Sequence, residues 1–218
     1  MTKEKESAAV AEVNGFVVSC SATADGDRGI FHSSLVIEVP RRGRDGSLTA
    51  ARYPALFEGK VADKTRFDKL AESVGEAPVK VTVRGELSLK ENGESVIFGR
   101  TIAPGQWESP SAKVEITGRL GYFTRSEKTV ALPVETKTGT VKVMFDSREC
   151  DASAWESVAD QRVGKDHRVS VTGVLDNDLT WDGRVYVSRF RVRGRTFEDK
   201  TLALKRSEEQ RRAAKMKS

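Results

Sequence analysis

The chain repeats one pattern of apolar residues and glycines at a constant offset of 88 positions. The matched pairs are Phe57 and Phe145, Phe67 and Trp155, Val81 and Val169, Val83 and Val171, Gly85 and Gly173, and Leu87 and Leu175. Solenoid repeats have periods of about 20 to 50 residues, so this longer offset indicates two copies of a whole small domain. A chain of 218 residues has room for two domains of ordinary size.

Each copy contains a β-hairpin at an equivalent position. In residues 79–102 and in residues 168–192 the first strand alternates apolar and polar side chains, the pattern of a strand with one buried face. The turn signals Asn92-Gly93 and Asp182-Gly183 then separate the first strand from a second one. The repeat unit therefore ends in a hairpin.

A helical stretch precedes each hairpin, at residues 63–74 and 153–163, and three extended runs precede each helix. The runs are 13–22, 30–39 and 53–57 in the first copy, and 113–123, 128–135 and 140–145 in the second. This order predicts an all-β protein with short helices: two tandem OB-fold five-stranded Greek-key barrels, each with a helix between strands three and four. A single larger sandwich would not place helices at the same point in both halves.

Two prolines bound a short linker between the copies, Ala103 to Ser111. We expect a first domain at residues 1–104, a second at residues 112–202, and a basic C-terminal tail at residues 203–218. We interpret residues 205–217 of this tail as a basic helix that either contacts nucleic acid or frays at its end, and we favour fraying.

Composition limits the class of protein. With 38% hydrophobic and 32% charged residues, the chain reads as soluble, and no apolar run approaches the ~20 residues of a membrane span. The charged N-terminus lacks an apolar segment typical of a secretory signal, which predicts a cytoplasmic protein. Cys20 and Cys150 occupy non-equivalent positions and are expected to be unpaired, buried thiols.

The sequence offers no catalytic, metal or cofactor site. His32 and His167 are not equivalent in the two copies, two cysteines cannot build a structural zinc site, and neither a nucleophile elbow nor a phosphate-binding loop occurs. We expect a protein that is not an enzyme and has no cofactor.

The second copy resembles the bacterial single-stranded DNA-binding proteins over residues 112–195. Lys113-Val114-Glu115-Ile116-Thr117-Gly118-Arg119-Leu120-Gly121 is similar to the first strand of that family, and Val141-Lys142-Val143-Met144-Phe145 to its third. Gly164 to Leu175 is similar to its fourth strand, and Trp181 lies near the position of a family tryptophan. The first copy follows the pattern more loosely.

The resemblance implies OB barrels that bind single-stranded DNA, but four features depart from it. The chain ends in a basic segment where the family has an acidic tip that recruits partners. Ala51 and Gly139 stand where the family has an aromatic residue, and Asp176-Asn177-Asp178 is acidic where the family is basic. The family also carries one barrel per chain and forms tetramers, whereas two barrels are fused here, so a homodimer with four barrels is left open.

Sequence-independent binding of single strands uses cations along the phosphates and aromatic rings on which bases stack. The net charge of +5 and the arginine-rich segment Arg184 to Arg195 fit this chemistry. The candidate nucleic-acid contacts are Arg41, Arg42, Arg44, Tyr53, Lys80, Arg84, Phe98, Arg100, Tyr122, Phe123, Arg125, Lys128, Trp181, Arg184, Tyr186, Arg189, Phe190, Arg191 and Arg193.

Structural alternatives stand beside these assignments. The arginine-rich strand could be a solvated edge protected by charge, the Arg41, Arg42 and Arg44 loop could serve solubility alone, and Trp181 could pack on its barrel. The matched residues Phe57, Phe145, Phe67 and Trp155 are expected in the cores.

The sequence thus predicts a sequence-independent single-stranded DNA-binding protein of replication or recombination, with a phage origin left open and the second copy binding more strongly. The alternatives are an OB-fold protein-interaction module and an RNA-binding protein. Replication or recombination proteins that act as partners are not specified by the sequence.

Overall fold

The computed structural model describes residues 7–21, 24–25, 31–42, 46–89, 94–159, 163–181 and 186–215, and the chain in these ranges is mostly β-strand. It divides into two compact units. The N-terminal unit comprises Val10–Val114 and Leu175–Arg191, and the C-terminal unit comprises Met1–Ala9, Glu115–Val174 and Val192–Ser218. Residues 175–191, which the sequence analysis assigns to the second domain, therefore group with the N-terminal unit.

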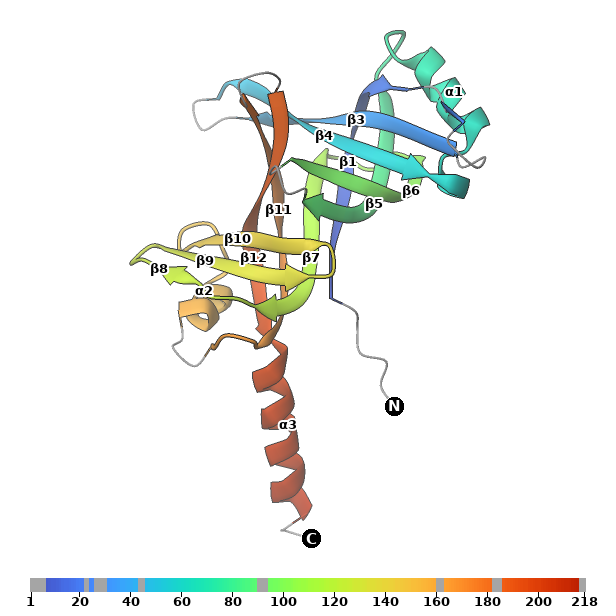
Figure 1. The fold of residues 1–218 in the computed structure, drawn as a ribbon. Helices are drawn as coiled ribbons and strands as arrows, with labels where there is room; N and C mark the ends of the chain where they lie inside the picture. Colours follow the sequence, from blue (N-terminus) through green and yellow to red (C-terminus); the bar gives the residue numbers. More distant parts are fainter. Residues whose placement is uncertain are drawn as a thin grey trace. The chain divides into compact units, whose positions relative to one another are not determined.

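The N-terminal unit contains a closed five-stranded barrel (Figure 1). Its strands are β1 (Ala8–Cys20), β3 (Phe31–Arg42), β4 (Leu48–Glu58), β5 (Val79–Leu89) and β6 (Ser95–Pro104). β1 pairs with β3 and β5, β3 with β4, and β5 with β6, all antiparallel, while β4 and β6 close the ring as a parallel pair. The two-residue β2 (Ala24–Asp25) adds to the edge of β3.

A short 3-10 turn, η2 (Gly59–Val61), and helix α1 (Lys64–Ser73) connect β4 to β5. The helix begins after Asp63 because the Asp63 carboxylate accepts a hydrogen bond from the Arg66 amide at 2.9 Å, satisfying a backbone donor of the first turn. Its buried residue, Phe67, packs against Phe57 with ring centroids 5.0 Å apart. The helix thus covers one end of the barrel core.

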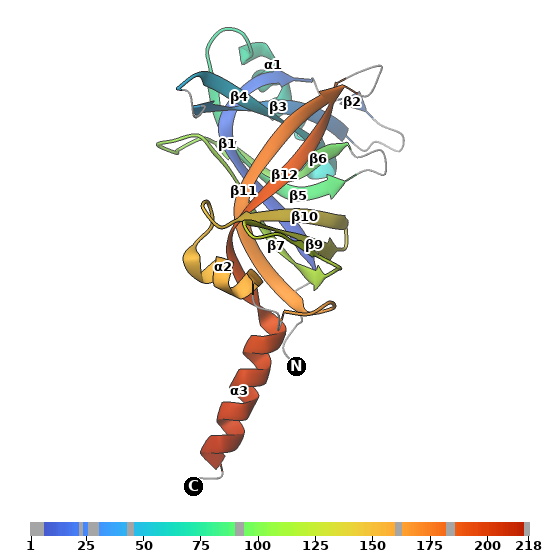
Figure 2. The same ribbon diagram turned by 90° about the vertical axis from the view of Figure 1, so that its left-hand side faces the viewer.

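The C-terminal unit has the same order of pairing. It is built from β7 (Ser111–Leu120), β9 (Thr129–Thr136), β10 (Gly139–Asp146), β11 (Arg168–Trp181) and β12 (Tyr186–Asp199), with a two-residue β8 (Thr124–Arg125) beside β9. The parts of β11 and β12 that fall within residues 175–191 group with the N-terminal unit. β7 pairs with β9 and β11, β9 with β10, and β11 with β12, and β10 and β12 form the parallel pair. Helix α2 (Ala152–Ala159) lies between β10 and β11, and helix α3 (Lys200–Lys215) continues directly from β12 (Figure 2).

A phenylalanine and a glycine fix the parallel pair in each unit. Phe57 and Phe145 are the penultimate residues of β4 and β10, and both rings are buried. A Cβ atom on Gly99 of β6 would lie 2.1 Å from the Phe57 ring, and one on Gly194 of β12 would lie 2.4 Å from the Phe145 ring. Each ring therefore occupies the space that a side chain on the fifth strand would need. This explains why both units have a glycine opposite the phenylalanine.

The expected strands and both expected helices are present, with bounds shifted by a few residues. The predicted turns at Asn92-Gly93 and Asp182-Gly183 lie outside the described residues. Phe57, Phe67 and Phe145 are core residues as predicted.

One sequence prediction about the helices is wrong. Trp155 is only half-buried, because Ala154 and Val158 provide the buried face of α2. The predicted basic helix of the C-terminal tail is present as α3, which begins where the Asp199 carboxylate accepts a hydrogen bond from the Leu202 amide at 2.9 Å.

Candidate nucleic-acid interface

The most exposed large aromatic ring described in the structure belongs to Tyr122, which follows β7 and is 80% exposed. The ammonium group of Lys165 lies 4.3 Å from the centroid of the Tyr122 ring. Next to it, the guanidinium of Arg125 lies 4.5 Å from the centroid of the half-buried Phe123 ring. Two rings, each with a cation over its face, thus adjoin in sequence at one end of the C-terminal barrel. We call Tyr122, Phe123, Arg125 and Lys165 the ring-cation cluster.

The exposed face of β10 belongs to the same sheet as β8, which contains Arg125 of the ring-cation cluster. Along β10 the residues alternate between buried and exposed, and Thr140, Lys142 and Met144 occupy the exposed positions. Met144 pairs in register with Ala131 of β9, which in turn pairs with Thr124 of β8. Lys128, before β9, is also exposed. The predicted contacts Tyr122, Phe123, Arg125 and Lys128 therefore come from one region of the C-terminal unit.

The N-terminal unit has a sparser set. Phe98 on β6 is 38% exposed and Arg84 on β5 is exposed. Arg100 forms an ion pair with Glu86, so part of its charge is neutralised. Arg42, at the end of β3, is exposed and pairs in register with Leu48, which is 81% exposed. The exposure of Leu48 was not predicted from the sequence, because a single leucine after a glycine-rich loop belongs to no periodic pattern.

Lys80, a predicted nucleic-acid contact, is exposed and lies beside the linker. Its ammonium group lies 4.7 Å from the centroid of the Trp107 ring. Trp107 belongs to the linker after β6, and its indole N–H donates to the Val81 carbonyl at 3.1 Å, while its ring meets the Phe16 ring edge-on at 5.3 Å. The linker is therefore held on the N-terminal barrel by Trp107, with Lys80 over its face. The sequence analysis did not identify this contact, because a tryptophan between two prolines has no periodicity to interpret.

Tyr53 is a correction to the predicted interface. The residue is fully buried, and its hydroxyl donates to the Leu175 carbonyl at 2.6 Å. Its ring lies 5.9 Å from that of Phe190, and the guanidinium of Arg41 lies at the same distance over its face. A ring in this environment cannot stack on a base, so Tyr53 is a packing residue of the N-terminal unit.

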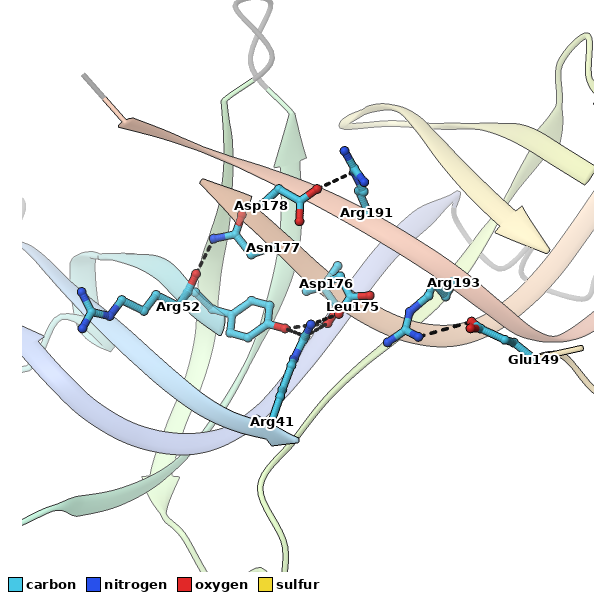
Figure 3. Close-up of polar contacts among 10 residues, drawn as sticks. Arg41, Arg52, Glu149, Leu175, Asp176, Asn177, Asp178, Arg191 and Arg193 are labelled. Atoms are coloured by element: carbon cyan, nitrogen blue, oxygen red, sulfur yellow. Dashed lines mark hydrogen bonds and ion pairs between the residues drawn. The ribbon is translucent and has the colours of Figure 1, made fainter. Parts of the chain in front are cut away.

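Arg41 is engaged in the same network (Figure 3). Its guanidinium donates to the Leu175 carbonyl at 2.9 Å and also contacts the Asp176 carboxylate and the Tyr53 hydroxyl. The side chain of Asn177 donates to the Arg52 carbonyl and to the Ser188 hydroxyl. Residues 176–178 are therefore held against β3 and β4 by these hydrogen bonds. The hydrogen-bond donors of Arg41 point at protein groups instead of at solvent.

The arginine-rich strand β12 divides between packing and exposure. Phe190 packs against Tyr53, and its amide donates to the hydroxyl of the buried Ser95 at 3.1 Å. Arg189 and Arg191 are exposed on the opposite face, and Arg191 lies 2.6 Å from the Asp178 carboxylate (Figure 3).

In the C-terminal unit Arg193 forms an ion pair with Glu149 at 3.3 Å. From residue 189 to residue 195 the arginines alternate with Phe190, Val192 and Gly194, and among these Val192 is buried.

The remaining predicted contacts fall outside the description. Arg44 and Arg184 lie among the residues that are not described, as do the side chains of Trp181 and Tyr186. Their roles stay predictions.

The described residues contain no group of three histidine, cysteine or acidic side chains that could hold a metal ion. Across the same ranges, none of the helices combines the length and the apolar character needed to cross a membrane.

Both cysteines are unpaired and half-buried. Burial, with a smaller contribution from the negative charge of Asp68, raises the pKa of the Cys20 thiol to about 11. Burial also raises the pKa of Cys150. Neither thiol has the lowered pKa that marks a reactive cysteine.

No protein-family model matches the sequence, and no curated protein matches it. Two solved structures of the single-stranded DNA-binding protein from Thermus aquaticus match in fold. A deletion variant is 16% identical with a TM-score of 0.62, covering 89% of this chain and 95% of that one. The wild-type protein is 15% identical with a TM-score of 0.61, covering 89% of this chain and 93% of that one. The chain thus has the fold of a single-stranded DNA-binding protein, and its closed five-stranded barrel fits the OB-fold that the sequence resemblance implies.

Proposed function

We propose that the chain binds single-stranded DNA without sequence preference, as two OB-folds in tandem. The two rings of strands with the same pairing order, each closed by a parallel pair, support the tandem assignment. The solved structures with this fold carry a name that describes single-stranded DNA binding. The role is one of binding, without catalysis.

The ring-cation cluster is the observation that carries this proposal. The Tyr122 ring is 80% exposed, and the Lys165 ammonium group lies over it at 4.3 Å from its centroid. A base can stack on such a ring, and the ammonium group beside it can contact the adjoining phosphate. This combination recognises any base, because every base has an aromatic face.

Charge supports the same ligand. The chain carries 37 basic and 32 acidic residues. On the C-terminal barrel, Arg125, Lys128, Lys142 and Lys165 lie on or beside the surface that contains Tyr122. A polyanion that follows these cations would release its counterions, which favours binding at low salt.

The two units contribute unequally under this proposal. In the N-terminal unit Arg41 and Tyr53 contact residues 175–176. Among its described candidates, Phe98 is the exposed aromatic ring, and the exposed cations are Arg42, Lys80, Arg84, Arg100, Arg189 and Arg191. The C-terminal unit has the ring-cation cluster and β10. We therefore propose that the C-terminal unit supplies most of the affinity.

The biological setting follows from this ligand class. We propose that the protein coats and protects single strands exposed during replication or recombination, in the cytosol of a bacterium or of a phage-infected cell.

Competition between matched nucleic acids tests the proposal. A fluorescein-labelled oligothymidylate of about 30 nucleotides, enough for two OB-folds, is bound and then displaced by unlabelled single-stranded DNA, RNA or duplex DNA of one mixed sequence. We expect single-stranded DNA to displace the probe at the lowest concentration and duplex to displace it poorly. Stronger displacement by RNA would reassign the ligand, and no binding of any nucleic acid would favour a protein-interaction module.

A further inference from the structure

Tyr122 and Lys165 are 43 positions apart, and a clamp of backbone hydrogen bonds brings them together. The Leu120 amide donates to the His167 carbonyl at 2.8 Å, and the Asp166 amide donates to the Leu120 carbonyl at 2.8 Å. Lys165 directly precedes this clamp and Tyr122 follows it by two residues. The spacing between ring and cation is therefore set by residues 164–167.

The backbone of this loop is held in an uncommon conformation. Asp166 has a φ of 65°, the only positive φ of a residue other than glycine among those described. Aspartate tolerates the left-handed region better than most residues, but at a cost in free energy that the surrounding contacts must offset. A loop in this state needs a tether beyond its own hydrogen bonds.

His167 supplies that tether. Its Nδ1 lies 2.7 Å from the Asp199 Oδ2, and because a carboxylate only accepts, the ring nitrogen donates. The His167 side chain is 19% exposed and the Asp199 side chain 7% exposed, so the contact is shielded from water. The other oxygen of Asp199 accepts from the Leu202 amide, and the Thr201 hydroxyl accepts from the Arg168 amide at 2.8 Å.

We infer that His167 is a positioning residue for base stacking: it fixes the loop that holds Lys165 over Tyr122, and Asp199 anchors it at the start of α3. This inference rests on the proposed nucleic-acid binding. Without the imidazole, Lys165 would sample many positions, and binding would have to order the loop. His167 itself makes no contact with the ligand.

A double-mutant cycle separates positioning from a structural role. His167→Ala should weaken binding of labelled oligothymidylate about three- to tenfold, the range that corresponds to one hydrogen bond. In a Tyr122→Ala background the same change should have almost no further effect, since there is no ring left to position. His32→Ala is the matched control: His32 also faces a carboxylate, Glu58 at 3.7 Å, but its side chain is 47% exposed and belongs to the other barrel. It should bind as the wild type does.

Asp199→Asn tests the same contact with a second variant, in case His167→Ala fails to fold. Asparagine caps a helix as well as aspartate does, so α3 should be retained by circular dichroism while the contact with His167 is weakened. Affinity should fall in the same direction as for His167→Ala. Wild-type affinity in both variants, or equal effects of His167→Ala with and without Tyr122, would overturn the inference alone. Failure of the wild-type protein to bind any oligonucleotide would overturn the proposed function and the inference with it.

Discussion

At the scale of single residues, Tyr122 should separate binding from stability most clearly. Its ring is 80% exposed, so Tyr122→Ala removes little buried surface and should leave the melting temperature nearly unchanged. Stacking of a base is worth about 1 to 3 kcal/mol, so oligonucleotide affinity should fall about tenfold. Tyr122→Phe, which keeps the ring, should retain most of the affinity. A Tyr122→Ala protein that binds normally would remove Tyr122 from the interface.

The thiol of Cys20 predicts a dependence of stability on pH. Its pKa is raised from 9.0 to about 11 in the folded protein, where Sγ also lies 3.7 Å from the Phe67 carbonyl. Between these values the folded state binds more protons than the unfolded state, so the free energy of unfolding should fall as the pH rises from 9 to 11. Urea titrations at a series of pH values measure this fall, and Cys20→Ser, which cannot titrate there, should show a smaller one.

The repeat identified the buried phenylalanines correctly but misplaced a tryptophan, and aromatic residues without a match had no comparable signal. Phe57 and Phe145 match across the copies and are both buried. Tyr53 has no matched partner, and the residues that cover it, Leu175 and Phe190, are more than 120 positions away in sequence. Trp155 was assigned to the core by its match with Phe67, but the smaller Ala154 and Val158 face inward instead. The proposed stacking role of Trp181 stays a prediction.

At the scale of elements, the glycines facing Phe57 and Phe145 give a matched pair of predictions. Gly99→Ala and Gly194→Ala would each place a methyl group against a buried ring, at 2.1 Å and 2.4 Å. Overpacking of this kind costs about 1 to 3 kcal/mol, measured as a lower denaturation midpoint. Gly46→Ala is a poor control because its φ is 80°, so Ala50→Gly, at an exposed position of β4, serves instead. Unchanged midpoints in both glycine variants would contradict the proposed role of the rings.

The strands and the chain's last helix have different signals in the sequence. Alternation of apolar and polar residues located β5 and β11, since one face of each strand is buried. Helix α3 shows almost no apolar stripe, and it is exposed along most of its length. Its signals are local: an aspartate cap at its start, and Lys205 and Glu208 four positions before Glu209 and Arg212. They agree with the basic helix predicted at residues 205–217, whose fraying stays a prediction.

At the scale of the whole molecule, the N-terminal unit includes a segment remote in sequence. Residues 175–191 contribute the carbonyl that accepts from Tyr53 and the amide that donates to the buried Ser95. A fragment of residues 1–114 should therefore melt at a lower temperature than the same fragment mixed with a peptide of residues 173–193, since a bound peptide stabilises the folded state. A scrambled peptide is the control. No shift with the native peptide would contradict this grouping.

The assignment of residues 175–191 to the N-terminal unit could not be predicted from the sequence. The repeat predicts two copies of one domain and the order of strands within each, because those features depend on local patterns and on matched positions. The attachment of residues 175–178 to β3 and β4 depends on Arg41, Tyr53 and Asn177, whose partners cannot be deduced from spacing or periodicity.

Salt dependence of binding tests the central claim most directly. The affinity of the full-length protein for a fluorescein-labelled oligothymidylate of about 30 nucleotides is measured by anisotropy over a series of salt concentrations. The account predicts tight binding at low salt and a linear fall of log affinity with log salt, by about 0.7 for each phosphate neutralised. Lys165→Ala should make that slope shallower. Absence of binding at the lowest salt, or an affinity that does not change with salt, would contradict the account.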